Sequence, residues 1–279
     1  MSRTLNLAGR TIHTELPAFI MGIVNVTPDS FWEGSRAGDT GLELALSLIE
    51  AGADILDLGG ESTRPGSAYV DEHEEIGRIV PLIKQIREHS SIPISVDTRK
   101  SGVLKAAIEA GADLLNDVSA LADDETMASV AARLSIPVVL MHKKGIPETM
   151  QQGIQYDDVV SEVCDFLAGR VQYALDAGIV PDRIILDPGI GFGKRHEDNV
   201  ALIRNIDRLL ELGYPVMMAL SRKSSIGQMT GKSVDKRMAG SLCANMYAVQ
   251  KGAGYLRVHD VEETRDMLAV LQELEPRWN

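Results

Sequence analysis

Apolar and polar positions follow a repeating order along this chain. Short apolar runs, each long enough for one buried strand, alternate with longer segments whose apolar residues recur every three to four positions. The helical spacing is clear at residues 76–83 and again at residues 103–110. Strands that alternate with helices in this way predict a parallel sheet covered by helices.

The apolar runs end on polar residues, and the segments that follow these ends are long. The residues at or beside the eight ends are Asn25, Glu61, Asp97, Asn116, His142, Asp187, Ser221 and His259. The connections leading into the next run are short and close on glycines such as Gly52 and Gly111. Because the strand ends and following loops of a (β/α)8 barrel build its active site, we expect a (β/α)8 TIM barrel with one functional face.

Length and composition agree with one such barrel. A chain of 279 residues matches the usual size of about 250, so we expect residues 1–279 to form a single domain. With 44% hydrophobic and 24% charged residues, the composition is that of a globular protein. The apolar runs are much shorter than the ~18 residues of a membrane span, and the start lacks a signal-peptide core. We therefore expect a cytoplasmic protein that does not bind membranes.

Charge narrows the choice of partner. A net charge of −12 argues against nucleic acid, whose binding depends on clustered positive charge. Basic residues nevertheless follow the predicted strand ends, namely Arg64, Arg222, Lys223, Arg257 and His259. A local basic site of this kind would suit a small polyanionic substrate. Cys164 and Cys243 have no metal-ligand partners nearby in sequence and are expected to be reduced, packed thiols.

Seven motifs together resemble those of the dihydropteroate synthase family. They are NVTPDSF at Asn25–Phe31, GGESTRPG at Gly59–Gly66, SVDTRK at Ser95–Lys100, NDV at Asn116–Val118, DPGIGFGK at Asp187–Lys194, SRKS at Ser221–Ser224 and RVHD at Arg257–Asp260. The likeness extends from Met21 to Asp260 in the family's order. The family joins 6-hydroxymethyl-7,8-dihydropterin diphosphate to p-aminobenzoate in folate biosynthesis, releasing diphosphate and 7,8-dihydropteroate. The resemblance also implies Mg²⁺ as cofactor, a homodimer in contact through the late helices, and a family that is the target of sulfonamides, with the altered first loop at Trp32-Glu33 able to change susceptibility.

For the pterin, the resemblance implies binding by Asp97, Asn116 and Asp187. Carboxylate and amide oxygens are matched acceptors for the donor-rich edge of a pterin, which carries an amide N–H and an exocyclic amine. The alternative for each carboxylate is an internal ion pair with a barrel lysine or arginine. Met141 and Phe192 are expected to line the pterin slot, although core packing explains them nearly as well.

For the diphosphate, the resemblance implies contacts from Arg64, Arg257 and His259, with Asn25 coordinating Mg²⁺ together with the diphosphate. One amide side chain makes a weak metal site, so we expect the ion to arrive mainly with the substrate. His259 has an alternative interpretation as a neutral histidine that caps its strand end. Lys223, which could bridge pterin and diphosphate, is the strongest single candidate for a catalytic residue.

For p-aminobenzoate, the resemblance implies a pocket made by Phe31, Thr63, Pro65 and Ser224. An aromatic amine is already a free nucleophile at neutral pH, so no general base is required, and His142 is interpreted as structural. We expect p-aminobenzoate to bind only after the pterin diphosphate, with mobile loops excluding water.

The chain departs from the usual family pattern at Trp32-Glu33, Ala219 and Lys143-Lys144, all near the expected site. Two other interpretations remain open: a corrinoid-type pterin methyltransferase, and a non-catalytic paralogue that binds pterin. The chain retains all of the expected anion-binding residues, Arg64, Lys223, Arg257 and His259. Their retention favours an enzyme with a diphosphate leaving group over both of these alternatives.

Overall fold

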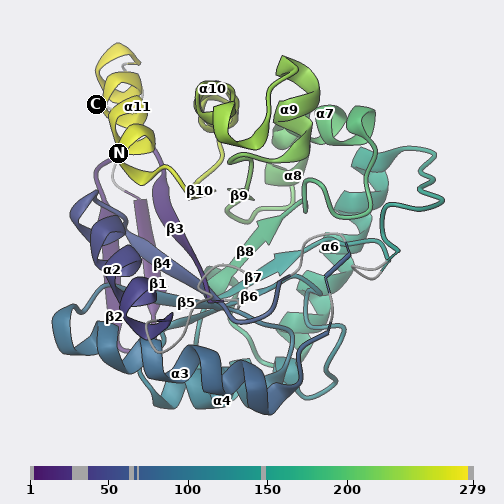
Figure 1. Ribbon diagram of the computed structural model, residues 1–279. Coiled ribbons are helices and arrows are strands. Elements are labelled where there is room, and N and C mark those ends of the chain that lie inside the picture. The colour runs from purple at the N-terminus through teal and green to yellow at the C-terminus, as the bar shows by residue number, and fades with distance from the viewer. Residues whose placement is uncertain (1–2, 27–36, 63–65, 68, 146–148, 276–279) are drawn as a thin grey trace.

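A computed structural model describes residues 3–26, 37–62, 66–67, 69–145 and 149–275. Its centre is a sheet of eight parallel strands in the order β8-β7-β6-β5-β4-β3-β10-β9 (Figure 1). The strands are β3 (Phe19–Asn25), β4 (Ile55–Gly59), β5 (Ile94–Asp97), β6 (Leu114–Asp117), β7 (Val138–Met141), β8 (Ile184–Asp187), β9 (Met217–Met218) and β10 (Tyr255–Val258). A parallel bridge between Leu186 and Val216 joins β8 to the segment entering β9. This bridge closes the sheet, and the predicted TIM barrel is confirmed.

Helices surround the barrel on its outside (Figure 1). They are α2 (Ala37–Glu50), α3 (Glu72–His89), α4 (Ser101–Glu109), α5 (Met127–Leu134), α6 (Val159–Asp176), α7 (His196–Arg204), α8 (Ile206–Leu210), α9 (Ser224–Thr230), α10 (Met238–Gln250) and α11 (Val261–Leu274), with short 3-10 turns η1 (Pro181–Arg183) and η2 (Val234–Lys236). Helix α3 continues through Pro81. The segment after β9, expected only as one of the long connections that follow the strand ends, contains the short helix α9, which has too few residues to show apolar periodicity. None of the described helices is long and apolar enough to span a bilayer.

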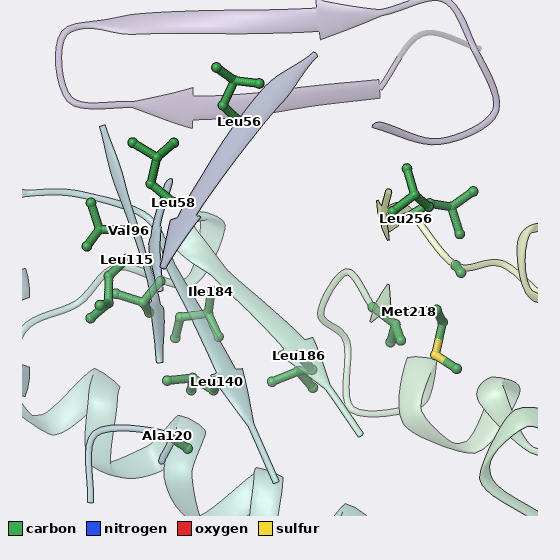
Figure 2. Close-up of a cluster of buried hydrophobic side chains, with 14 of the residues drawn as sticks. Leu56, Leu58, Val96, Leu115, Ala120, Leu140, Ile184, Leu186, Met218 and Leu256 are labelled. Atoms are coloured by element: carbon green, nitrogen blue, oxygen red, sulfur yellow. The ribbon is translucent and has the colours of Figure 1, made fainter. Parts of the chain in front are cut away.

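Each strand divides its side chains between two sides of the barrel wall, as the two-residue period of a strand requires. Leu56 and Leu58 of β4 face outward with Val96 and Leu115 of the neighbouring strands, and they pack in the layer beneath the helices (Figure 2). Asp57 lies between the two leucines in sequence and therefore faces the barrel interior. This alternation leaves the inner positions near the strand ends available for polar side chains.

An antiparallel hairpin covers the amino-terminal end of the barrel. Its strands are β1 (Arg3–Leu7) and β2 (Arg10–Thr14), and the sequence analysis did not predict it. Leu5 and Leu7 are buried in one cluster with residues that begin the barrel strands, including Phe19 and Tyr255. The Phe19 and Tyr255 rings stack with centroids 5.1 Å apart. The hairpin thus completes an apolar floor, and the polar ends of the strands lie at the opposite end of the barrel.

The two cysteines differ in their surroundings. Cys164 of α6 is buried, as expected, but Cys243 of α10 is exposed, so the expectation that both are packed is wrong for Cys243. Both thiols are free. Cys243 lies on a shallow groove between α10 and α11, with a volume of about 440 Å³, whose lining includes Leu242, Met246 and Val270. A helical spacing could not predict this exposure, because α10 is apolar on several faces.

Candidate active site

The three acceptor residues expected to bind pterin lie together at the carboxyl ends of the strands. Asp97 ends β5, Asn116 lies in β6 and Asp187 ends β8, and all three are buried. Asp97 and Asn116 are direct partners across β5 and β6, and Asp187 is paired with Met141 across β7 and β8. The parallel strands therefore bring the three side chains to the same mouth of the barrel, with Asp187 two positions further along than Ile185, which is aligned with Asn116 through Val139.

Arg257 reaches this group of side chains from β10. Its Nη2 donates to Oδ2 of Asp97 at 2.9 Å, and its Nε donates to Oδ2 of Asp57 at 2.6 Å. The internal ion pair considered as an alternative for Asp97 is therefore present, and it uses one carboxylate oxygen. Burial raises the pKa of Asp97 above the usual range of a carboxyl group, against the opposing effect of Arg257. The carboxylates and the guanidinium form one connected site rather than two separate groups.

Asp57 was missed by the sequence analysis. It is fully buried on the inner face of β4, in the middle of the apolar run DILDLGG rather than at its end. The signal that could have found it is the period of two, which puts Asp57 on the same face as Gly59. A charged residue at an inward position in mid-strand is costly unless it is paired, and Arg257 supplies the pairing here.

Lys223 and Asp187 approach one another through the loop that follows β8. The backbone N–H of Gly189 donates to Oδ1 of Asp187 at 2.7 Å, and Lys223 Nζ donates to the carbonyl of Ile190 at 2.5 Å. Nζ also lies 5.1 Å from the centroid of the Phe192 ring, within the range of a cation–π contact. Burial raises the pKa of Asp187, whereas Lys223 opposes that rise. The two charges thus belong to the same site.

The pKa of Lys223 is itself shifted by its surroundings. Burial lowers it to about 8, while the nearby carboxylates of Asp187 and Asp97 act in the opposite direction. Lys223 is the residue before helix α9, so its position is fixed by the start of that helix. A lysine with this pKa carries its charge at neutral pH and loses it in mildly alkaline solution.

A second lysine, Lys194, donates hydrogen bonds to the same loop and was not among the expected site residues. It is almost completely buried, and its Nζ lies 2.8 Å from Nδ1 of His142, 3.0 Å from the carbonyl of Gly189 and 3.2 Å from that of Phe192. Burial lowers the pKa of Lys194 to about 7. Burial also lowers the pKa of His142 to about 3, so its neutral ring accepts from Lys194, and this favours the structural interpretation of His142.

His259 and Asn25 lie at the ends of the adjoining strands β10 and β3. The backbone N–H of His259 donates to Oγ of Ser221 at 3.2 Å, and its Nδ1 lies 3.1 Å from the same hydroxyl. These contacts are compatible with either interpretation of His259. Arg222 forms an ion pair with Asp260, which gives it a structural partner.

Asn25 borders a small open space at the mouth. It is aligned with Gly59 in the register of β3 and β4, and Gly59 is in turn aligned with Asp97. A Cβ atom at Gly59 would lie 3.9 Å from Oδ1 of Asn25 and 3.9 Å from Oδ2 of Asp97. The glycine therefore keeps the space between these two oxygen atoms free of a side chain.

Four of the expected site residues lie outside the described part of the chain, so their placement stays a prediction; they are Phe31, Thr63, Arg64 and Pro65. Ser224 is described, and it is the exposed first residue of α9, directly after Lys223.

Glu61 lies just before the segment that contains Thr63, Arg64 and Pro65, and it contacts a residue on the other side of that segment. Glu61 accepts from Val70 N–H at 3.0 Å and from Lys100 Nζ at 2.8 Å, and it also pairs with Arg99. Burial alone would raise the pKa of Glu61, but Arg99 and Lys100 hold it below its usual value. Glu61 is therefore an ionised anchor at the beginning of this loop.

The chemistry of this arrangement follows from its composition. Buried oxygen acceptors at three strand ends fit a flat heterocycle with several N–H donors, and the cations Lys223 and Arg257 fit an anionic group attached to it. The fold and the site together define a TIM-barrel enzyme that acts on a heterocyclic, anionic small molecule.

Comparison with known proteins agrees with this class. Residues 21–259 match the family of pterin binding enzymes. The dihydropteroate synthase of Clostridium beijerinckii is 42% identical over 94% of this chain and 93% of its own length. The dihydropteroate synthase of Xanthomonas albilineans superposes with a TM-score of 0.91 in a structure with 4-aminobenzoic acid, at 46% identity over 98% of both chains. A structure of that enzyme with 7,8-dihydropteroate gives a TM-score of 0.87, at 43% identity over 98% of both chains. The chain belongs to the dihydropteroate synthase family of pterin-binding enzymes.

Proposed function

We propose that this protein is a transferase of folate biosynthesis that condenses 6-hydroxymethyl-7,8-dihydropterin diphosphate with p-aminobenzoate. The observation that carries the proposal is the direct contact of Arg257 with Asp97 at the barrel mouth. This contact places a cation suited to diphosphate beside an acceptor suited to the pterin. The homology of the chain to dihydropteroate synthases over nearly its whole length supports the same conclusion.

The pterin is bound, in this proposal, by the oxygens of Asp97, Asn116 and Asp187. Each accepts from the N–H donors of the ring edge, and the buried surroundings strengthen these hydrogen bonds. Met141 is buried at the end of β7, and Phe192 is half-buried beside Lys223, so in this proposal both contact the flat faces of the ring. Negative charge from the two carboxylates favours the positive charge that develops on the pterin as its bond to diphosphate breaks.

The reaction forms one bond and breaks one. The amine nitrogen of p-aminobenzoate attacks the exocyclic methylene carbon, the C–O bond breaks, and its electron pair leaves with the diphosphate. Lys223, Arg257, His259 and Arg64 bind the departing anion and stabilise its charge. The nitrogen then loses a proton, and because the product amine is weakly basic, water is a sufficient acceptor.

We assign Mg²⁺ as the cofactor, held by Asn25 together with oxygens of the diphosphate. The amide oxygen of Asn25 borders the space over Gly59, and oxygen ligands are those that Mg²⁺ prefers. Among the described residues, no three acidic, histidine or cysteine side chains form a metal-binding group. The residues present therefore suit an ion whose remaining ligands come from the substrate and water. Bound at Asn25, Mg²⁺ would offset the negative charge of the diphosphate.

The amine substrate binds, in this proposal, between Ser224 and the loops that carry Phe31, Thr63 and Pro65, after the pterin diphosphate is in place. Sulfonamides resemble p-aminobenzoate and should compete for this pocket. Calorimetric titration of p-aminobenzoate into the protein tests the order: binding should require the pterin and diphosphate to be present. Tight binding to the protein alone would contradict it.

The protein is proposed to act as a homodimer, with the groove between α10 and α11 as the contact. Met246 and Val270 line the groove, and both are more than one third exposed. Exposed apolar side chains gathered on one face are typical of a surface that is covered in the assembled protein. A cytoplasmic location stays a prediction from the sequence.

The function is tested by incubating the purified protein with the pterin diphosphate, p-aminobenzoate and Mg²⁺. Diphosphate should be released only when the amine is present, and 7,8-dihydropteroate should form in equal amount. A methyltransferase would release none, and a non-catalytic paralogue would bind the pterin without releasing diphosphate. Either result would contradict the proposal.

A further inference from the structure

Asp57 links two parts of the site that come from distant strands. It lies on the inner face of β4 and is fully buried. Its Oδ2 accepts from Arg257 Nε of β10 at 2.6 Å and from Asn116 Nδ2 of β6 at 3.1 Å. One carboxylate oxygen therefore contacts both a residue proposed to bind the pterin and a residue proposed to bind the diphosphate.

The contact with Asn116 determines which end of its amide faces the ligand. A carboxylate only accepts hydrogen bonds, so the nitrogen of the amide must be the atom that faces Asp57. The amide oxygen then points to the opposite side of the group. Without Asp57, the amide could rotate and present its NH₂ to the donor edge of the ring, where donor would meet donor.

The contact with Arg257 determines the direction of its guanidinium. Nε is taken by Asp57 and Nη2 by Asp97, so two carboxylates from adjacent strands hold one edge of the planar group. The other edge, formed by Nη1 and Nη2, is thereby directed away from these carboxylates. Two parallel N–H donors on one edge are the arrangement that binds an oxyanion in a bidentate manner.

We infer that Asp57 is a positioning residue of this active site, which orients the amide of Asn116 toward the pterin and the guanidinium of Arg257 toward the diphosphate. The inference rests on the proposed function for the identity of these two ligands. Asp57 itself lies one inward position below the mouth and acts through its two partners. Its effect should therefore fall on the pterin diphosphate and leave p-aminobenzoate nearly unaffected.

The test compares Asp57→Ala and Asp57→Asn with the wild-type full-length protein. In Asp57→Ala, we expect KM for the pterin diphosphate to rise about ten- to hundredfold, with KM for p-aminobenzoate within about threefold of wild type. Asp57→Asn keeps an acceptor of the same shape, and we expect it to restore most of the affinity. An unchanged KM for the pterin diphosphate in Asp57→Ala would overturn the inference.

Ser95→Ala is the matched control. Ser95 is the register partner of Asp57 on β5, it is equally buried, and its Oγ has no hydrogen-bond partner in the described part of the chain. Its removal at the same depth should leave both KM values at the wild-type level. If Ser95→Ala raised KM as much as Asp57→Ala, disturbed packing would explain both effects, and the positioning role would be lost.

A double-mutant cycle with Asn116→Ala separates positioning from stability. If Asp57 acts through Asn116, the loss of pterin affinity in the double variant should be smaller than the product of the two single losses. Losses that multiply would contradict the role. If Asp57→Ala does not fold, the cycle is run with Asp57→Asn. A KM for the pterin diphosphate more than about thirtyfold above wild type in Asp57→Asn would contradict the expected rescue, and with it the inference.

Pterin binding is also measured directly, by fluorescence titration of the ring without p-aminobenzoate. A wild-type protein that binds the pterin but does not release diphosphate would refute the proposed function, while the affinities of the Asp57 variants would still decide the positioning role. A failure of the proposed function and a failure of the positioning role of Asp57 therefore give different results.

Discussion

Lys223 donates from its ammonium to the carbonyl oxygen of Ile190, with the two atoms 2.5 Å apart. This hydrogen bond holds the charge of Lys223 against the loop that follows β8, beside the ring of Phe192. The cation is therefore oriented before any substrate binds. A group that is held in place in advance loses little further freedom when it contacts the transition state.

Replacing Lys223 by alanine should lower kcat/KM for the pterin diphosphate by about 10–100-fold, the equivalent of about 1.5–3 kcal/mol for one charge-assisted contact. Steady-state kinetics with both substrates measures this change. Lys232→Ala is the control, because Lys232 is an exposed lysine in the segment after α9 and should leave turnover unchanged. Wild-type turnover in Lys223→Ala would refute the role of Lys223.

The pH dependence of the reaction should report the lowered pKa of Lys223. Its pKa is about 8, so the side chain is charged below that pH and neutral above it. We therefore expect kcat/KM for the pterin diphosphate to fall as the pH rises above about 8. In Lys223→Arg the fall should move to higher pH, because arginine keeps its charge. An alkaline limb that stays in place in Lys223→Arg would assign the titration to another group.

The acidic side of the same profile should report Asp97, because burial raises its pKa above the usual range of a carboxyl group. Protonation turns one acceptor oxygen into a donor, so affinity for the donor edge of the pterin should weaken as the pH falls through this raised pKa. Asp97→Asn has no titrating group and should bind the pterin weakly without this limb. Fluorescence titration of the pterin from pH 6 to pH 9 measures both proteins, and identical limbs would contradict the assignment.

Gly189 should tolerate no side chain. A Cβ there would lie 1.9 Å from the backbone oxygen of His142, and its φ is +67°. Gly231, at φ +68°, has nothing within 4 Å of its Cβ position and is the matched control. Both alanine variants should lose about 1–2 kcal/mol to backbone strain, and Gly189→Ala should lose about 1–3 kcal/mol more to the clash. Urea unfolding measures both, and equal losses would contradict the close approach.

The hairpin at the floor of the barrel should contribute to stability without affecting catalysis. Leu5→Ala removes a buried side chain and should reduce the free energy of unfolding by about 2–5 kcal/mol. Thr4→Ala, at the exposed neighbouring position, should have an effect within about 0.5 kcal/mol. Both variants should keep the wild-type KM values at a temperature where they are folded. A stable Leu5→Ala protein would show that the floor is dispensable.

The proposed dimer predicts a different change at the α10–α11 surface. Val270 is 58% exposed and lines the groove, so Val270→Lys should place a charge in the contact and shift the protein to monomers. Val180→Lys alters a valine that is 45% exposed at a separate site, just before η1, and should leave the assembly intact. Sedimentation velocity distinguishes these states, and a Val270→Lys protein that sediments like the wild type would place the contact elsewhere.

The barrel and the polar mouth could be predicted because both depend on local patterns. Each strand shows its period in a few residues, and parallel strands must end at the same edge, so Asp97, Asn116 and Asp187 were expected together. The hairpin was missed although Arg3–Leu7 alternates polar and apolar residues, a signal that was present but too short to stand out. Helix α9 was missed for a similar reason, since two turns show no period.

The pairings within the site could not be read from the sequence. Asp57 and Arg257 are separated by 200 positions, and only the closed barrel brings β4 and β10 to the same interior. Ion pairing and ligand binding by Asp97 are alternatives when only the sequence is known, whereas its contact with Arg257 is compatible with both. Lys194 was missed because its partners are mainly backbone carbonyls, which have no signature in the sequence.

The apolar floor of the barrel limits where substrates can enter and products can leave this enzyme. Packed side chains such as Ile55, Val139 and Ile185 fill the barrel interior above the hairpin, so both reactants must arrive, and both products must depart, by way of the same opening. The larger product, 7,8-dihydropteroate, therefore blocks the exit of any product that lies deeper in the site. We expect product release to follow a fixed order, in which the product nearest the solvent leaves first.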